Sequence, residues 1–183
     1  MRAYNLDADA NRYKNLHVSQ VADWDRLEGF DATPRAATWS PVGVEHSPDE
    51  FDKPGGDYPN LHGVASACVF SARAVEVLGD LLDGRGELLP LTGDQGSFFL
   101  FNVTHFTEAF DEELSAYQRY SDGGVMGVER YVFDPQRLSE ETIFKLRDLP
   151  GLYTYVTDAF VERVQEAGLT GFRFDRVVWE SDG

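Results

Sequence analysis

The stretch that decides the fold spans residues 152–179 and reads LYTYVTDAFVERVQEAGLTGFRFDRVVW. Aromatic and β-branched residues at 153–156 predict a strand. Asp158 follows, and its carboxylate is suited to accept hydrogen bonds from the free N–H groups of a first helical turn. The apolar residues that recur at helical spacing are Phe160, Val161 and Val164. The sequence therefore predicts a strand that leads into a capped amphipathic helix.

The second half of this stretch predicts a helix end and a returning strand. Gly168 suits the position just past the helix, because glycine accepts a positive φ. Residues 171–179 then alternate, with Phe172, Phe174 and Val177 opposed to Arg173, Asp175 and Arg176. No candidate catalytic residue lies in this strand–helix–strand unit, so we interpret it as scaffold.

A similar succession is predicted in the middle of the chain. A buried strand at 64–70 leads to Ser71, the expected N-cap of a helix that ends before Gly84. The apolar face of that helix contains Ala74, Val75, Leu78, Leu81 and Leu82. A short strand at 87–91 precedes a nearly continuous apolar run at 97–104. Such a run predicts a central strand covered on both faces, most simply by the two helices.

The remaining elements are short. Further strands are predicted at 4–6, 16–19, 128–133 and 143–146, with an edge strand limited by its proline at 39–44. Residues 134–142 predict a turn or one loose helical turn. A chain of 183 residues with 42% hydrophobic content can bury one sizeable core. We therefore expect a single α+β domain over residues 1–183, with a mixed central β-sheet and a few flanking α-helices.

Net charge is the strongest compositional signal. The 32 acidic and 16 basic residues leave a formal charge of −16. A phosphate backbone would be repelled by that field, because the basic residues are scattered, so nucleic acid is not expected as a partner. A basic protein partner fits better. The alternative explanation of the total charge is solubility alone.

The single cysteine and the hydropathy pattern exclude other classes. Cys68 lies in an apolar run, which favours a buried small hydrophobe over a nucleophile and leaves no internal disulfide. Residues 1–12 lack the apolar segment of a signal peptide. No apolar run approaches the roughly 18 residues that a membrane helix requires. We therefore expect a cytoplasmic protein with no membrane partner.

Catalytic motifs are missing from the sequence. Residues 93–97 lack the lysine of a phosphate-binding loop, and no dinucleotide fingerprint or nucleophile elbow occurs. The four histidines are isolated, without the local spacing of a metal site, and His62 with Cys68 is the only pair worth noting. We expect no enzymatic activity, no metal and no cofactor.

Several motifs follow one another in an order that identifies a family. They are a strand-to-helix step at Phe70–Leu78, a short strand at Glu87–Leu91, a strand running into an acidic segment at Asn102–Ser115, a strand at Ile143–Leu146 and the C-terminal unit. This order resembles that of immunity protein family eleven of bacterial polymorphic toxin systems. Members of this family are small cytoplasmic proteins. The resemblance covers residues 61–178, whereas residues 1–60 match little.

The resemblance implies a stoichiometric antidote that binds a cognate toxin, delivered by a neighbouring cell, and blocks it by direct occlusion. Two alternatives stay open. One is a small cytoplasmic enzyme with a non-local active site, for which His62, His105 and Asp94 are the candidate active-site residues. The other is a regulatory protein-binding module. An adjacent toxin gene would distinguish the antidote from both.

Partner-binding residues are chosen from charge and loop character, because members of the family face different toxins. The acidic candidates are Asp49, Glu50, Asp52, Asp111, Glu112 and Glu113, and the candidate aromatic anchors are Phe51 and Tyr58. On a helix, Glu108, Asp111 and Glu112 would share a face, and a solvated helix start is the alternative interpretation of these acids. The sequence leaves homo-oligomerisation open.

Overall fold

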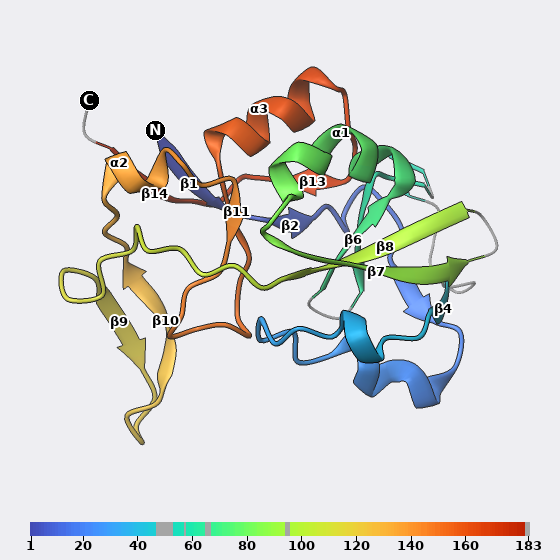
Figure 1. Ribbon diagram of the computed structural model, residues 1–183, viewed down its shortest axis with the longest axis horizontal. Helices are drawn as coiled ribbons and strands as arrows, with labels where there is room; N and C mark the ends of the chain where they lie inside the picture. The colour runs from blue at the N-terminus through green and yellow to red at the C-terminus, as the bar shows by residue number, and fades with distance from the viewer. Residues whose placement is uncertain (47–52, 57, 65–66, 94–95, 182–183) are drawn as a thin grey trace.

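The computed structural model describes residues 1–46, 53–56, 58–64, 67–93 and 96–181, and it shows a mixed α+β fold (Figure 1). The largest sheet has the order β3-β4-β7-β8-β6-β5, in which only the β4–β7 pairing is parallel. Its strands are β3 (Leu16–Val18), β4 (Val42–His46), β5 (Leu61–Val64), β6 (Ala67–Ser71), β7 (Gly86–Gly93) and β8 (Gly96–Val103). The predicted mixed central sheet is thus confirmed.

A second sheet joins the two ends of the described chain. Its order is β11-β12-β1-β14, and all its pairings are antiparallel. These strands are β1 (Arg2–Asn5), β11 (Ile143–Phe144), β12 (Tyr155–Thr157) and β14 (Val177–Glu180). Two further pairs are β2 (Asp7–Ala8) with β13 (Phe172–Arg173), and β9 (Ala116–Arg119) with β10 (Val125–Arg130).

Three α-helices and two 3₁₀ helices complete the described fold. They are α1 (Ala72–Leu82), α2 (Pro135–Leu138), α3 (Asp158–Glu166), η1 (Val21–Leu27) and η2 (Ala36–Thr38). Ser71 caps α1 as predicted, because its Oγ accepts a hydrogen bond from Ala74 N at 3.2 Å. Gly84 and Gly168 follow α1 and α3 with φ of 69° and 61°, which is the left-handed conformation expected of glycine past a helix end.

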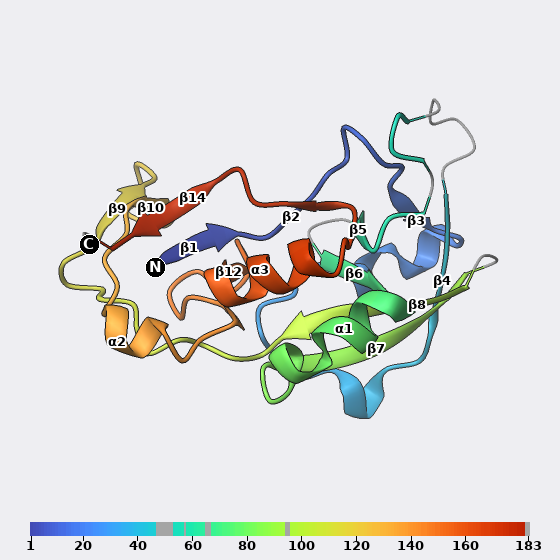
Figure 2. The same cartoon turned by 90° about the horizontal axis from the view of Figure 1, so that it is seen from above.

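Both long helices cover one face of the central sheet (Figure 2). Phe101 and Val103 of β8 belong to the same buried cluster as Leu78 of α1 and Phe160 of α3. The opposite face carries Leu100, which packs in a second cluster with Leu27 at the end of η1 and with Phe30. The prediction that the two helices cover opposite faces was therefore wrong. The second face is covered by the N-terminal part of the chain, in which the 3₁₀ helix η1 lacks a regular apolar period.

Several predicted strand boundaries also need correction. β4 is an internal strand, not an edge strand, since it lies between β3 and β7 in the sheet. Pro41 permits this position because it precedes the first residue of β4 and so removes no N–H group from the ladder. The buried strand predicted at 64–70 is instead the antiparallel pair β5 and β6. The alternating strand predicted at 171–179 is divided into β13 and β14, which pair with different partners. Val177 is consequently exposed, whereas Val178 and Trp179 pack against a third cluster.

Asp158 has a different role from the predicted N-cap. It is the first residue of α3, and Thr157 occupies the cap position without a side-chain capping bond, because its hydroxyl donates to Glu141 O at 2.7 Å. The Asp158 carboxylate accepts hydrogen bonds from Arg2 N and Tyr4 Oη, each at 2.8 Å. The carboxylate thus bonds to two residues that lie more than 150 positions away in the sequence. Asp158 joins the start of α3 to β1.

The buried face of α3 gives a direct test of the core. Phe160→Asp or Val164→Asp should cost about 3–5 kcal/mol of unfolding free energy, because each places an unpaired charge at a position that is at most 2% exposed. Gln165→Asp adds the same charge to an exposed position of the same helix and is the matched control. Urea unfolding measures all three variants. Equal midpoints for Val164→Asp and Gln165→Asp would contradict the packing of α3.

Candidate functional site

The acidic segment selected from the sequence forms a turn, not a helix. Asp111 Oδ1 accepts a hydrogen bond from Leu114 N at 2.9 Å, and Asp111 O accepts one from Ser115 N at 3.1 Å. Asp111 N donates to Val132 O at 2.9 Å. This turn leaves Glu112 and Glu113 exposed to solvent and Asp111 half-buried. The helical face shared by Glu108, Asp111 and Glu112 is therefore not formed.

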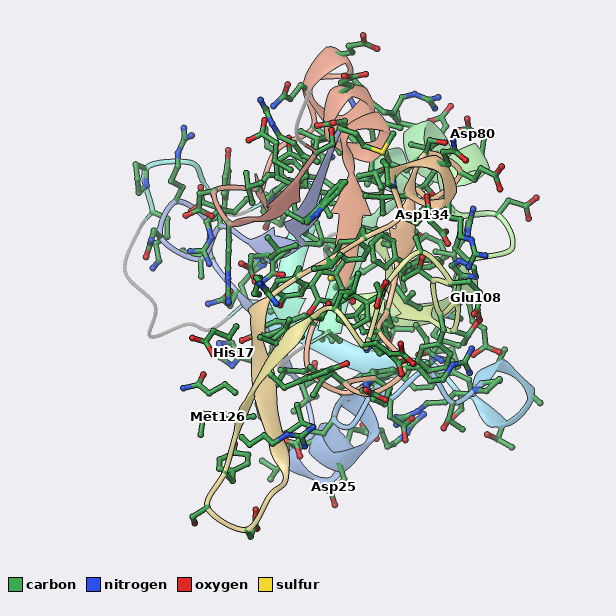
Figure 3. All side chains as sticks on the ribbon, turned by 90° about the vertical axis from the view of Figure 1, so that its left-hand side faces the viewer. His17, Asp25, Asp80, Glu108, Met126 and Asp134 are labelled. Carbon is green, nitrogen blue, oxygen red and sulfur yellow. The ribbon has the colours of Figure 1, made fainter. Side chains whose placement is uncertain are left out.

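This turn leads directly into a hairpin that projects from the body of the molecule (Figures 1 and 3). The hairpin consists of β9 and β10, and Met126 lies on it. Its base is anchored by Tyr117, whose hydroxyl donates to Asp148 Oδ2 at 2.9 Å. The sequence pattern predicts a strand only from 128, and β9 was missed. The turn residues Asp122, Gly123 and Gly124 were the available signal.

Among the other predicted binding residues, Tyr58 is the one that the structure describes. Asp49, Glu50, Phe51 and Asp52 lie outside the described residues. Tyr58 is 56% exposed, and its ring makes an edge contact with His46 of β4 at 5.0 Å between centroids. β4 and the β9–β10 hairpin lie at opposite ends of the long axis of the molecule (Figures 1 and 2). Tyr58 is therefore remote from the acidic turn.

His62 and Cys68 do not form a catalytic pair. The ring of His62 packs at 5.3 Å from that of Phe98 in the second cluster, whereas Cys68 packs against the first cluster. The two side chains thus belong to opposite faces of the sheet. Burial raises the pKa of the Cys68 thiol to about 12, so the thiolate is not available at neutral pH. Cys68 behaves as the small apolar residue that its sequence context predicted.

A cleft of about 390 Å³ opens near β2, β3 and the β5–β6 pair. Its lining includes Leu6, Asp7, Trp24, His62, Gly63 and Cys68. His62 is buried at 1% exposure, and this burial, together with the neighbouring His46, lowers the pKa of the imidazole to about 4. At neutral pH the wall of the cleft therefore presents a neutral imidazole and a protonated thiol. These groups lack the thiolate–imidazolium pair of a cysteine nucleophile.

His105 lies in a separate charged cluster. Its Nε2 is 2.8 Å from Glu141 Oε2, and Arg85 Nη1 contacts both groups. Arg85 also donates to Glu140 O at 2.7 Å. These contacts join the start of β7 to the segment before β11 and occupy Nε2 of the ring. Of the two remaining candidate active-site residues, His62 packs against Phe98 of the second cluster, and Asp94 lies outside the described residues.

Clusters of metal ligands and helices of membrane-spanning length are both absent from the described ranges. No group of three or more His, Cys, Asp or Glu side chains that could hold a metal ion occurs there. No described helix is long and apolar enough to cross a membrane.

His62 gives a pH-dependent prediction. Because its pKa is lowered from 6.5 to about 4, the unfolded chain takes up this proton before the folded chain does. The free energy of unfolding should therefore fall as pH drops from about 6.5 toward 4, by up to about 3 kcal/mol from this group. Urea unfolding at about pH 7 and about pH 5 should show a smaller loss for His62→Gln than for the wild type. His17→Gln, at an exposed position, should keep the wild-type difference.

Comparison with known proteins gives a family. Residues 92–178 match the model of a family described as "Immunity protein family (Imm11)", and no curated protein matches the chain. The match runs from the end of β7 to β14, and so includes the acidic turn and the whole β9–β10 hairpin. The motifs at Phe70–Leu78 and Glu87–Leu91 lie before it. The family resemblance predicted from the sequence is thus confirmed: residues 92–178 of this chain are similar to the Imm11 immunity protein family.

Proposed function

We propose that this protein is the antidote of a polymorphic toxin system, which binds a cognate toxin domain in the cytoplasm and neutralises it by direct occlusion. The family match over residues 92–178 carries this proposal. Two observations support it: His62 and Cys68 face opposite sides of the sheet, and His105 lies in a separate charged cluster. A protein without an assembled catalytic site can still act by covering the surface of another.

The partner that we propose is basic. The formal charge of −16 favours encounter with a cationic protein and opposes direct contact with nucleic acid. Glu112 and Glu113 project from the turn before β9 and are exposed. Charges at the rim of an interface mainly steer the approach of the partner, whereas buried anchors determine how long the complex lasts.

Neutralisation is tested with the toxin domain encoded next to this chain. Co-expression should restore growth, and the two proteins should co-purify. Titration of the purified toxin should reach full inhibition at about one antidote per toxin, because occlusion requires a complex. Protection at far lower ratios would indicate a catalytic antidote and reject occlusion. No binding and no rescue would reject the antidote function itself.

Charge reversal tests the steering surface. Glu112→Lys with Glu113→Lys should lower the association rate at low salt by about tenfold, because two attractive charges become repulsive. The difference should shrink near physiological ionic strength, where the screening length is about 8 Å.

Glu162→Lys with Glu166→Lys is the matched control, since it changes the net charge equally at exposed positions of α3. Surface-based kinetics should show the larger effect for the turn variant. Reversal of Asp49 and Glu50 tests the alternative acidic group selected from the sequence. Equal rates for the turn variant and the α3 control at low salt would exclude the acidic turn as the steering surface.

A further inference from the structure

The β9–β10 hairpin is supported by the protein on one face only. Tyr117 and Val128 are directly paired, and with Val125 they pack against the third buried cluster. Gln118 and Gly127 form the next pair and belong to the other face. An added Cβ at Gly127 would meet nothing within 4 Å, so that face is open. An isolated two-stranded hairpin is marginally stable in water, and this one therefore depends on its anchored face.

Large apolar side chains are exposed toward the end of this hairpin. Tyr120, the first residue of the turn, is 54% exposed. Its N–H closes the turn by donating to Gly124 O at 2.8 Å. Met126 is 37% exposed and lies where the register between β9 and β10 shifts. Such bulges redirect a side chain away from the regular alternation. The end of the hairpin thus presents a tyrosine from the turn and a methionine from β10, two residue types enriched in protein interfaces.

Leu114, 59% exposed, lies in the acidic turn at the base of the same hairpin. It places a third apolar side chain next to Glu112 and Glu113 in sequence. Leu114 O accepts a hydrogen bond from Arg130 at 3.0 Å, which ties this turn to the end of β10. The acidic turn and the hairpin therefore form one continuous surface.

The charges around these apolar residues are mainly negative. Residues 111–130 contain five acidic and two basic side chains. Both arginines are engaged within the hairpin region, Arg119 with Gly123 O at 3.0 Å and Arg130 with Leu114 O. The exposed acids are Glu112, Glu113, Asp122 and Glu129. An apolar centre within an acidic rim is complementary to a recess on a basic protein.

We propose that the β9–β10 hairpin and the acidic turn before it are the docking element for the toxin, with Tyr120 and Met126 inserted into an apolar recess of a basic toxin surface. This inference rests on the proposed antidote function and names the surface that performs it. The occupant is the cognate toxin domain, because the acidic rim selects a cationic protein. A second copy of this acidic chain would bring two negative rims together.

Tyr120→Ala and Met126→Ala test the anchors. Each should weaken binding of the toxin domain encoded next to this chain by about 10- to 30-fold, mainly through faster dissociation and with little dependence on salt. Tyr58→Ala tests the competing anchor selected from the sequence, because Tyr58 has nearly the same exposure but contacts β4 at the other end of the molecule. All three variants should melt like the wild type. Lysozyme serves as an unrelated basic protein that should not bind.

Hydrogen exchange on the wild-type complex gives a second readout that needs no variant. Amides in 117–128 should be protected by the toxin, whereas those of α3 should be unchanged. Wild-type binding with no protection of the hairpin, or with a larger loss from Tyr58→Ala than from Tyr120→Ala, would overturn this docking surface and leave the antidote function standing. Absence of wild-type binding would instead reject the proposed function. Self-association lost in Tyr120→Ala would assign the hairpin to a homodimer and overturn the toxin as its occupant.

Discussion

Burial of β8 on both faces is the constraint on which the rest of this fold depends. Leu100 and Phe101 are adjacent in the strand, so their side chains point to opposite faces, and both are at most 4% exposed. Burying such a side chain stabilises the fold by about 1.5–3 kcal/mol. That gain requires a cover on each side of the sheet. α1 and α3 supply one cover, and the segment from η1 to Phe30 supplies the other.

The same constraint connects the region of the family match to the rest of the chain. Residues 92–178 contain β8, but the strands on either side of it, β7 and β6, lie wholly or almost wholly before residue 92. β12 likewise pairs with β1, which comes from the first residues of the chain. The first ninety or so residues therefore complete both sheets. Their strands β7 and β1 pair with β8 and β12 of the matched region.

Local signals predicted the helices well, and long-range pairing limited the rest. The Ser71 cap and the buried face of α3 depend on residues within a turn or two, and both are observed. The role of Asp158 depends on Tyr4, which no local pattern connects to it. The register shifts in β9 and β10 remove the strict alternation by which a strand is recognised in sequence. Tyr120 and Met126 of the proposed docking surface were missed for that reason, whereas Glu112 and Glu113 were selected from their charge.

Charge alone could not select a binding surface, because acidic residues are distributed over the whole chain. Geometry restricts the choice. An interface of standard size covers about 800 Å² of each partner, which is less than a tenth of the 9699 Å² exposed by this molecule. Tyr58 and the acidic turn are at opposite ends of the long axis (Figures 1 and 2), so one interface of that size does not include both. Exposed apolar side chains accompany the acids at the hairpin end. Both an anchor and a steering field are therefore available there, in a part of the chain that the family match includes.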